Sequence, residues 1–218
     1  MHIPDGFLNT ATTAVTWVGA AGGVGYSVSR VKHELTERKV PLMGVTAAFI
    51  FAAQMLNFTV AGGTSGHLLG GALAVLLLGP WAGSIVITAV LIVQALLFQD
   101  GGVLAMGANI FNMAVVGILA SWWIYKLLIR LLGDKAGSST VAAFVAAWCS
   151  VVLASLAASA ELGFSGASPW GVVIPAMVGV HMLIGIGEGL ITTGVVAFLA
   201  ATRKDLLRQP APQTGGSA

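Results

Sequence analysis

The sequence has few charged residues and a single cysteine. Only 8% of its 218 residues are Asp, Glu, Lys or Arg, whereas soluble domains carry roughly 25%. So few charges cannot cover a water-exposed surface, which excludes a soluble domain, and we do not expect nucleic acid as a partner. Cys149 lies in an apolar run, which excludes an intramolecular disulfide and a CxxC-type metal site. No lysine completes a GxxxxGK[ST] phosphate-binding loop, which excludes a P-loop nucleotide-hydrolysing protein.

Apolar residues, in contrast, make up 57% of the chain and recur in long runs. This pattern predicts an all-α integral membrane protein. A single polytopic membrane domain is expected over residues 1–202, with an N-terminal segment 1–8, followed by a basic, disordered cytoplasmic tail over residues 203–218. The predicted transmembrane helices are residues 7–29, 41–60, 67–79, 81–97, 109–131, 140–160 and 172–200.

The positions of the basic residues predict the orientation of the helices. Residues 67–97 also fit one long element interrupted at Gly79-Pro80, which would leave six transmembrane helices. With seven, the segments 30–39, 126–135 and 203–208 all face the cytoplasm, and they contain all ten Lys and Arg residues. With six, the last two segments would lie outside, against the positive-inside rule. Seven helices, an external N-terminus and a cytoplasmic C-terminus are therefore predicted.

The first two residues are candidate metal ligands. Residues 1–8 have no basic n-region and include Asp5, so we expect the terminus not to be a cleaved signal peptide. A free Met1 amine, the His2 amide and the His2 imidazole can close two fused chelate rings, an arrangement that suits late divalent metals such as Ni²⁺. His67 would lie on the same outer face and can supply a fourth nitrogen. On the residues alone, the alternative is that Met1 is only the start residue and His2 an incidental interfacial residue.

Four motifs resemble the CbiM/NikM family, the substrate-binding membrane components of energy-coupling-factor transporters for cobalt and nickel. They are MHIPDGFL at residues 1–8, GGTSGHLLGG at 62–71, FQDGGVLAMGANIFNM at 98–113 and HMLIGIGEGLIT at 181–192. The resemblance implies that Met1, His2 and His67 bind Ni²⁺ or Co²⁺ as the transported substrate. It also implies that the protein lies in the plasma membrane of a prokaryote, with this site facing outward. It further implies a transmembrane coupling protein, two ATP-binding subunits and in many cases a small accessory membrane subunit as partners.

Further polar residues near these motifs are candidates for supporting the ligands. A nearby carboxylate would favour a bound cation, and amides can orient ligands, but such groups also join helices in membrane bundles. His181 and Glu188 are expected to lie within the last transmembrane helix, either on an ion pathway or, the interpretation favoured here, satisfied by neighbouring helices. The supporting candidates are Asp5, Thr64, Ser65, Asp100, Asn109, Asn112, His181 and Glu188.

Two other functions compete with substrate capture. A stand-alone metal channel or secondary carrier has the same composition. An intramembrane protease using Ser165 and His181 is disfavoured, because Ser165 falls in a loop rich in Gly and Ser. The ligand set suits both nickel and cobalt, and the Pro4-Asp5-Gly6 continuation leans toward the nickel branch of the family by resemblance.

Overall fold

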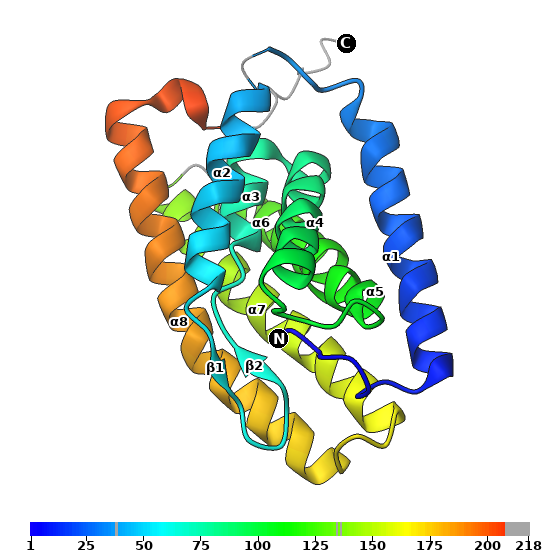
Figure 1. The fold of residues 1–218 in the computed structure, drawn as a ribbon. Helices are drawn as coiled ribbons and strands as arrows, with labels where there is room; N and C mark the ends of the chain where they lie inside the picture. Colours follow the sequence, from blue (N-terminus) through cyan, green and yellow to red (C-terminus); the bar gives the residue numbers. More distant parts are fainter. Residues whose placement is uncertain (38, 134, 136, 208–218) are drawn as a thin grey trace, which may run out of the picture.

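The computed structural model describes residues 1–37, 39–133, 135 and 137–207. Its order is α1 (Thr10–Val31), α2 (Lys39–Gln54), β1 (Phe58–Thr59), β2 (Ser65–Gly66), α3 (Gly71–Leu78), α4 (Pro80–Leu97), α5 (Met106–Ile110), the π-helix η1 (Phe111–Gly117), α6 (Ile118–Leu132), α7 (Ser138–Phe164), α8 (Trp170–Thr202) and the 3₁₀ turn η2 (Lys204–Leu206). Because α5, η1 and α6 are continuous, these elements form seven main helices (Figure 1).

The predicted all-helical architecture is confirmed within the described residues, where the only strands form one two-residue antiparallel pair. Four helices are long and apolar enough to cross a membrane: Pro80–Leu97, Met106–Leu132, Ser138–Phe164 and Trp170–Thr202. The helix α2 is apolar but has only 16 residues. Of the predicted tail, residues 203–207 contain η2, and residues 208–218 lie outside the described part.

The third predicted transmembrane helix is the one whose observed structure differs most from the prediction. Residues 67–79 were expected to cross the membrane, but α3 has only eight residues. Eight residues rise about 12 Å, well short of the roughly 30 Å apolar core of a bilayer. Gly70 and Gly79 flank the helix with φ of 77° and 83°, a backbone conformation that glycine adopts readily and residues with a Cβ adopt rarely. Pro80 then begins α4. The chain before α3 is therefore non-helical, and its backbone polar groups need partners other than a helical ladder.

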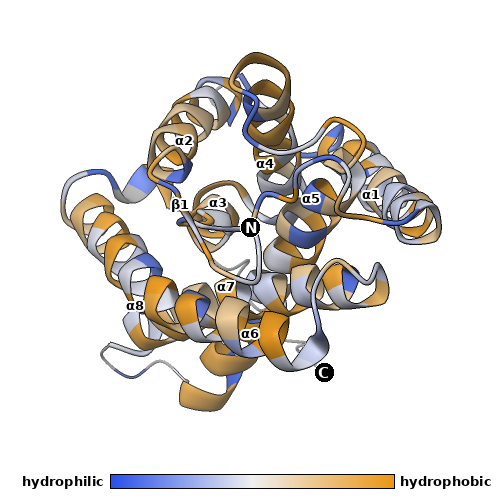
Figure 2. Cartoon of the chain, turned by 60° about the horizontal axis from the view of Figure 1, so that its bottom comes forward, coloured by the Kyte–Doolittle hydropathy of each residue, from blue (hydrophilic) through white to orange (hydrophobic). Residues whose placement is uncertain are grey.

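The short helix α3 lies inside the bundle. Six of its eight residues are buried, and it packs mainly against α4 and α6. Figure 2 shows α3 and the amino terminus enclosed by α2, α4, α5, α7 and α8. By contrast, α1 lies at the edge in Figure 1 and packs against α4 and the α5–η1 segment. The fold thus places the first residues of the chain next to the non-helical segment that leads into α3.

Candidate metal-binding site

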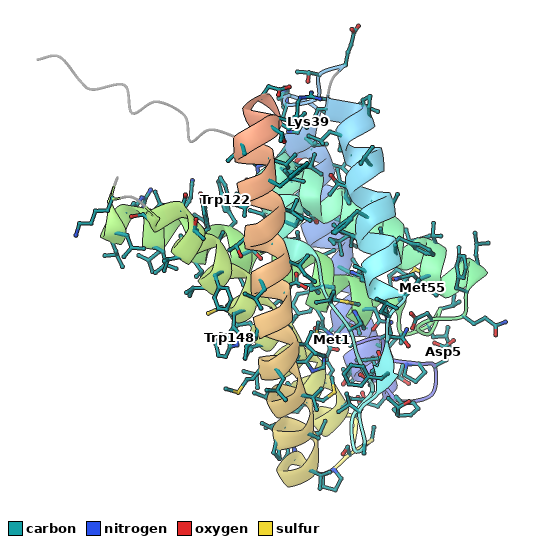
Figure 3. The ribbon with its side chains drawn as sticks, turned by 90° about the vertical axis from the view of Figure 1, so that its left-hand side faces the viewer. Met1, Asp5, Lys39, Met55, Trp122 and Trp148 are labelled. Carbon is teal, nitrogen blue, oxygen red and sulfur yellow. The ribbon has the colours of Figure 1, made fainter. Side chains whose placement is uncertain are left out.

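The amino terminus is buried inside the bundle. Met1 is 0% exposed and His2 4%, although a chain end is ordinarily among the most mobile parts of a protein. Figure 3 shows Met1 among the helices and Asp5 nearer the periphery. The Met1 amine donates to the carbonyl oxygen of Ser65 and, at 3.0 Å, to its Oγ, and the His2 amide donates to the same Oγ at 3.0 Å. Ser65 therefore contacts two of the proposed metal-binding nitrogens.

The next residues attach the terminus to the loop between α4 and α5. The Asn109 side chain accepts from the Ile3 amide at 2.8 Å and donates to the Ile3 carbonyl at 3.1 Å, and the Gly102 amide donates to the same carbonyl at 2.9 Å. The Asp5 carboxylate accepts from the amides of Val103, Leu104 and Ala105. Asp5 and Asn109 thus hold the terminal segment.

The two candidate histidine ligands lie side by side. The rings of His2 and His67 are stacked, with centroids 4.4 Å apart and planes inclined by 19°. Nδ1 of His2 lies 3.1 Å from Oδ1 of Asp100, and its Nε2 lies 3.1 Å from Oε1 of Gln94. Nδ1 of His67 lies 2.7 Å from the carbonyl oxygen of Leu68, which can only accept, so Nδ1 carries the proton. Nε2 of His67 is then an unprotonated nitrogen, and it is buried without a partner among the described residues.

Burial controls the protonation of these groups. Desolvation lowers the pKa of the Met1 amine well below its ordinary value, and Asp100 only partly opposes this. Desolvation, followed by the charges of the amine and His2, lowers the pKa of His67, and desolvation also lowers that of His2. Burial alone would raise the pKa of Asp100, but the neighbouring His2 and the amine lower it overall. These shifts favour neutral nitrogens at Met1 and His67 beside an ionised Asp100. At His2, burial is opposed by the two oxygen atoms that face its ring nitrogens, from Asp100 and Gln94, and both contacts raise the pKa.

Two buried side chains hold the backbone that follows His67. The Glu188 carboxylate on α8 accepts from the amides of Leu69 (2.8 Å) and Gly70 (2.6 Å), and the Gln54 amide on α2 donates to the Leu69 carbonyl at 2.7 Å. These bonds satisfy non-helical backbone inside the bundle, as a membrane interior requires. Glu188 thus binds a loop backbone, which neither of the two interpretations from the sequence anticipated.

Of the other supporting candidates, only some lie next to the candidate ligands. Asp100 contacts His2, whereas the Thr64 amide and hydroxyl approach the sulfur of Met177. Asn112 donates to Glu161 at 2.6 Å and is one helical turn away from Asn109. For His181, Nδ1 lies 2.6 Å from the Met177 carbonyl oxygen, and no described hydrogen bond joins it to Ser165.

Two residues at the site were not identified from the sequence: Gln54 and Gln94, both 0% exposed. Each is a glutamine in an otherwise apolar helix, and a polar side chain in such a helix usually faces the protein interior. This pattern could have identified both residues from the sequence.

The backbone approaches the terminus closely at Gly101 and Gly102. A Cβ on Gly102 would lie 2.0 Å from Oδ1 of Asp5, and one on Gly101 would lie 3.5 Å from the Cβ of His2. The glycines around His67 face elsewhere: a Cβ on Gly63 would meet Met177, and one on Gly66 would meet Phe58 and Ile184. The loop of residues 100–102 therefore leaves room for the terminus.

Among the described residues, no group of three or more His, Cys, Asp or Glu side chains is arranged to hold a metal ion. A metal at this position would therefore need main-chain nitrogens in addition to side chains, and the buried amine and amide beside the two imidazoles are such nitrogens. Fold and site together define a class: a multi-pass helical membrane protein with nitrogen donors gathered around its own amino terminus.

Comparison with known proteins identifies the family within that class. Residues 2–206 match the CbiM family, described as the cobalt uptake substrate-specific transmembrane region. A protein of Haloquadratum walsbyi whose name assigns it to metal transport is 44% identical over 209 residues, covering 95% of this chain and 93% of that protein. The fused nickel transport protein NikMN of Rhodobacter capsulatus is 36% identical over 221 residues, covering 95% of this chain and 64% of that protein.

A crystal structure of a truncated transition metal transporter superimposes with a TM-score of 0.84 at 36% identity, covering 92% of this chain and 99% of that one. The chain belongs to the CbiM family of transmembrane cobalt and nickel transport proteins.

Replacing Asn109 with Ala should weaken metal binding without unfolding the protein. The change leaves the buried Ile3 amide without its acceptor and frees the segment that carries both candidate ligands of the terminus, Met1 and His2. Loss of a supporting hydrogen bond typically costs about 10–100-fold in metal affinity, and we expect a loss in that range in a Ni²⁺ titration.

Asn9→Ala is a matched control. Asn9 caps α1 by accepting from the Thr12 amide, so its loss should cost about 1 kcal/mol of stability. Because this cap lies outside the metal site, affinity should stay unchanged. Equal affinity losses in the two variants would contradict a positioning role for Asn109.

Proposed function

We propose that this chain is the substrate-capture component of an ATP-driven energy-coupling-factor importer for Ni²⁺ or Co²⁺. The observation that carries the proposal is the free amino terminus, buried against His67 and held there by Ser65 and Asn109. Ordering a chain end inside a protein costs conformational entropy, and a terminus that supplies metal ligands accounts for that cost.

The proposed ligands are the Met1 amine, the His2 amide, Nδ1 of His2 and Nε2 of His67, in a nearly planar arrangement. In the present structure Nδ1 of His2 faces Asp100, so binding requires this ring to turn. A half-turn about the Cβ–Cγ bond exchanges Nδ1 with Cδ2 and moves the Nε2–H group to the Asp100 side. Asp100 would then accept from the metal-bound imidazole, the usual support for a histidine ligand.

The charges at the site also favour a divalent cation. Binding removes the proton of the His2 amide, which leaves one negative charge on the ligand set. The ionised Asp100 beside His2 adds a second. A divalent ion in this set is therefore neutralised locally, whereas an unpaired double charge in a buried site would be strongly disfavoured.

The orientation we propose places the site on the outer side of a prokaryotic plasma membrane. The loop after α1 and the end of α8 meet at one groove, lined in part by Lys39 and Arg203. The positive-inside rule favours this end as cytoplasmic, which leaves the β1–β2 hairpin and the N-terminus toward the outside and the C-terminus inside. Residues 1–202 would then form one membrane domain.

ATP hydrolysis belongs to partner proteins in this proposal. By resemblance to the family, the partners are a transmembrane coupling protein and two ATP-binding subunits. A small accessory membrane subunit is supported by the fused NikMN relative, of which this chain covers only 64%. Capture by this chain would then be followed by release into the cell that the partners drive.

Uptake measurements distinguish this function from that of a stand-alone channel or carrier. Cells that express the chain together with the coupling protein and ATP-binding subunits should accumulate radioactive Ni²⁺ or Co²⁺, and cells that express the chain alone should not. His67→Gln should remove uptake in the complete system, because it removes one of four ligands. Full-rate uptake by the chain alone would overturn the coupled mechanism in favour of a channel or carrier.

A further inference from the structure

Helix α8 runs along the non-helical segment that carries the candidate ligand His67. Near the outer end of the helix, the sulfur of Met177 receives the Thr64 amide at 3.4 Å, and further along, Glu188 binds the Gly70 amide. His181 is four residues after Met177 and seven before Glu188, so all three share one helix face. His181 therefore faces the segment between these two contacts, one turn further toward the cytoplasmic end than Met177.

The protonation state of His181 leaves one ring nitrogen available. The side chain is 0% exposed, and Nδ1 lies 2.6 Å from the Met177 carbonyl oxygen. Because a carbonyl only accepts, Nδ1 carries the proton and Nε2 carries a lone pair. Nε2 is buried and has no hydrogen-bond partner among the described residues. His67 is in the same state, with Nδ1 bonded to a backbone carbonyl and Nε2 without a partner.

Two buried imidazoles with unpartnered lone pairs call for an explanation. A buried acceptor without a donor is unfavourable, and such groups in native proteins usually have a water, an ion or a functional role. A backbone carbonyl that fixes Nδ1–H and leaves Nε2 free is the arrangement that prepares a histidine to bind a metal. The two rings also interact electrostatically, since a charge on His181 lowers the pKa of His67.

We propose that Nε2 of His181 is a fifth nitrogen donor to the captured ion, on the inward side of the four-nitrogen plane. This inference rests on the proposed function. The step is donation of a lone pair into an empty position on the metal, so no bond in the protein breaks and no electron is transferred. The fifth ligand faces the direction in which the ion must leave.

The fifth donor discriminates between the two candidate ions. Low-spin Ni²⁺ in a planar nitrogen field has a filled orbital along the axis and gains little from an axial ligand. Low-spin Co²⁺ has one electron fewer, so its axial orbital is half-filled and accepts a donor. His181 should therefore strengthen the binding of Co²⁺ and leave that of Ni²⁺ unchanged.

Electron paramagnetic resonance of the purified full-length protein loaded anaerobically with Co²⁺ tests the inference. One axial ¹⁴N nucleus splits the high-field cobalt lines into three, and protein labelled with ¹⁵N-histidine should give two. In His181→Gln the splitting should disappear while Co²⁺ still binds. Co²⁺ affinity should fall by at least about tenfold, the lower bound for loss of a supporting residue, with Ni²⁺ affinity unchanged.

His33→Gln is the matched control, since His33 is exposed in the turn after α1 and should leave every signal unchanged. Bound Co²⁺ with a planar spectrum but no axial splitting, or splitting that persists in His181→Gln, would overturn the inference and leave the proposed function intact. The wild-type isotope experiment decides the presence of an axial histidine even where the variant fails to fold. If the wild-type protein bound neither Ni²⁺ nor Co²⁺, both the inference about His181 and the proposed function would be overturned.

Discussion

Adding two residues before Met1 is expected to abolish the binding of Ni²⁺ and Co²⁺. The addition converts the Met1 amine into a peptide amide and moves the new amine away from the chelate. The structure offers no space for extra chain, because Met1 is 0% exposed and its amine donates to two oxygens of Ser65. We expect affinity to fall by more than about a hundredfold, the upper end of what loss of a supporting residue costs. Titration with each metal measures the effect.

The length of the extension matters. A single added residue makes His2 the third residue, and a terminal amine, two amides and Nδ1 of this histidine can then surround a metal without help from His67. With one added residue, the terminus should be displaced from its buried position and bind a metal on its own, so binding should become insensitive to His67→Ala. In the unextended protein the same substitution should remove it. The control appends the same two residues after Ala218 and should bind normally. Unchanged, His67-dependent binding by the protein with two residues added before Met1 would contradict the assigned ligands.

The sequence predicted the helical fold well, because long apolar runs are decided locally by the membrane. It failed for residues 67–79, where an apolar run of suitable composition forms a short buried helix between Gly70 and Gly79. An apolar run indicates that its residues are buried away from water. It does not distinguish a helix that faces lipid from one that is enclosed by other helices. Similarly, nothing in the pattern of residues 109–131 indicated the π-helix at Phe111–Gly117, since its hydrogen bonding depends on the packing around it.

The candidate site was predictable where its chemistry is local. Met1 and His2 are adjacent, so the chelate rings that we propose for them follow from covalent structure, and the ring of His67 stacks on that of His2. The partners of Glu188 and Gln54 were not predictable, because both bind the backbone of residues distant in sequence. Asn109 and Asn112 show the same limit: they lie one turn apart, yet one binds the terminal segment and the other binds Glu161. Which amide faces the site depends on how α5 and η1 pack.

The affinity for Ni²⁺ should fall about tenfold for each unit that pH drops from 8, because the proposed ligation by the His2 amide removes the proton of this amide at every pH in the range. Burial lowers the pKa of the Met1 amine, His2 and His67, so in the folded protein these three groups lose their protons at a lower pH than they would in water. Protons compete with Ni²⁺ for these three groups only below their lowered pKa values. In that range the affinity for Ni²⁺ should depend more steeply on pH. In a short Met-His peptide the amine, with an ordinary pKa near 8, would compete already at neutral pH.

The number of protons released on binding provides a separate measurement. Calorimetric titration at pH 8 in buffers of different ionisation enthalpy should show release of about one proton per Ni²⁺, from the His2 amide alone. Release of no proton would contradict amide ligation. Release of two would show that the Met1 amine is still protonated at pH 8, against the effect of its burial.

The stability of the metal-free protein must be followed in parallel. An amine and imidazoles whose pKa values are lowered by folding bind more protons when unfolded, so stability declines as pH falls from the unfolded values through the folded ones. A thermal unfolding curve at each pH separates this decline from proton competition at the site. If the protein is folded at pH 6 and affinity has dropped about a hundredfold from pH 8, the loss comes from the ligands themselves.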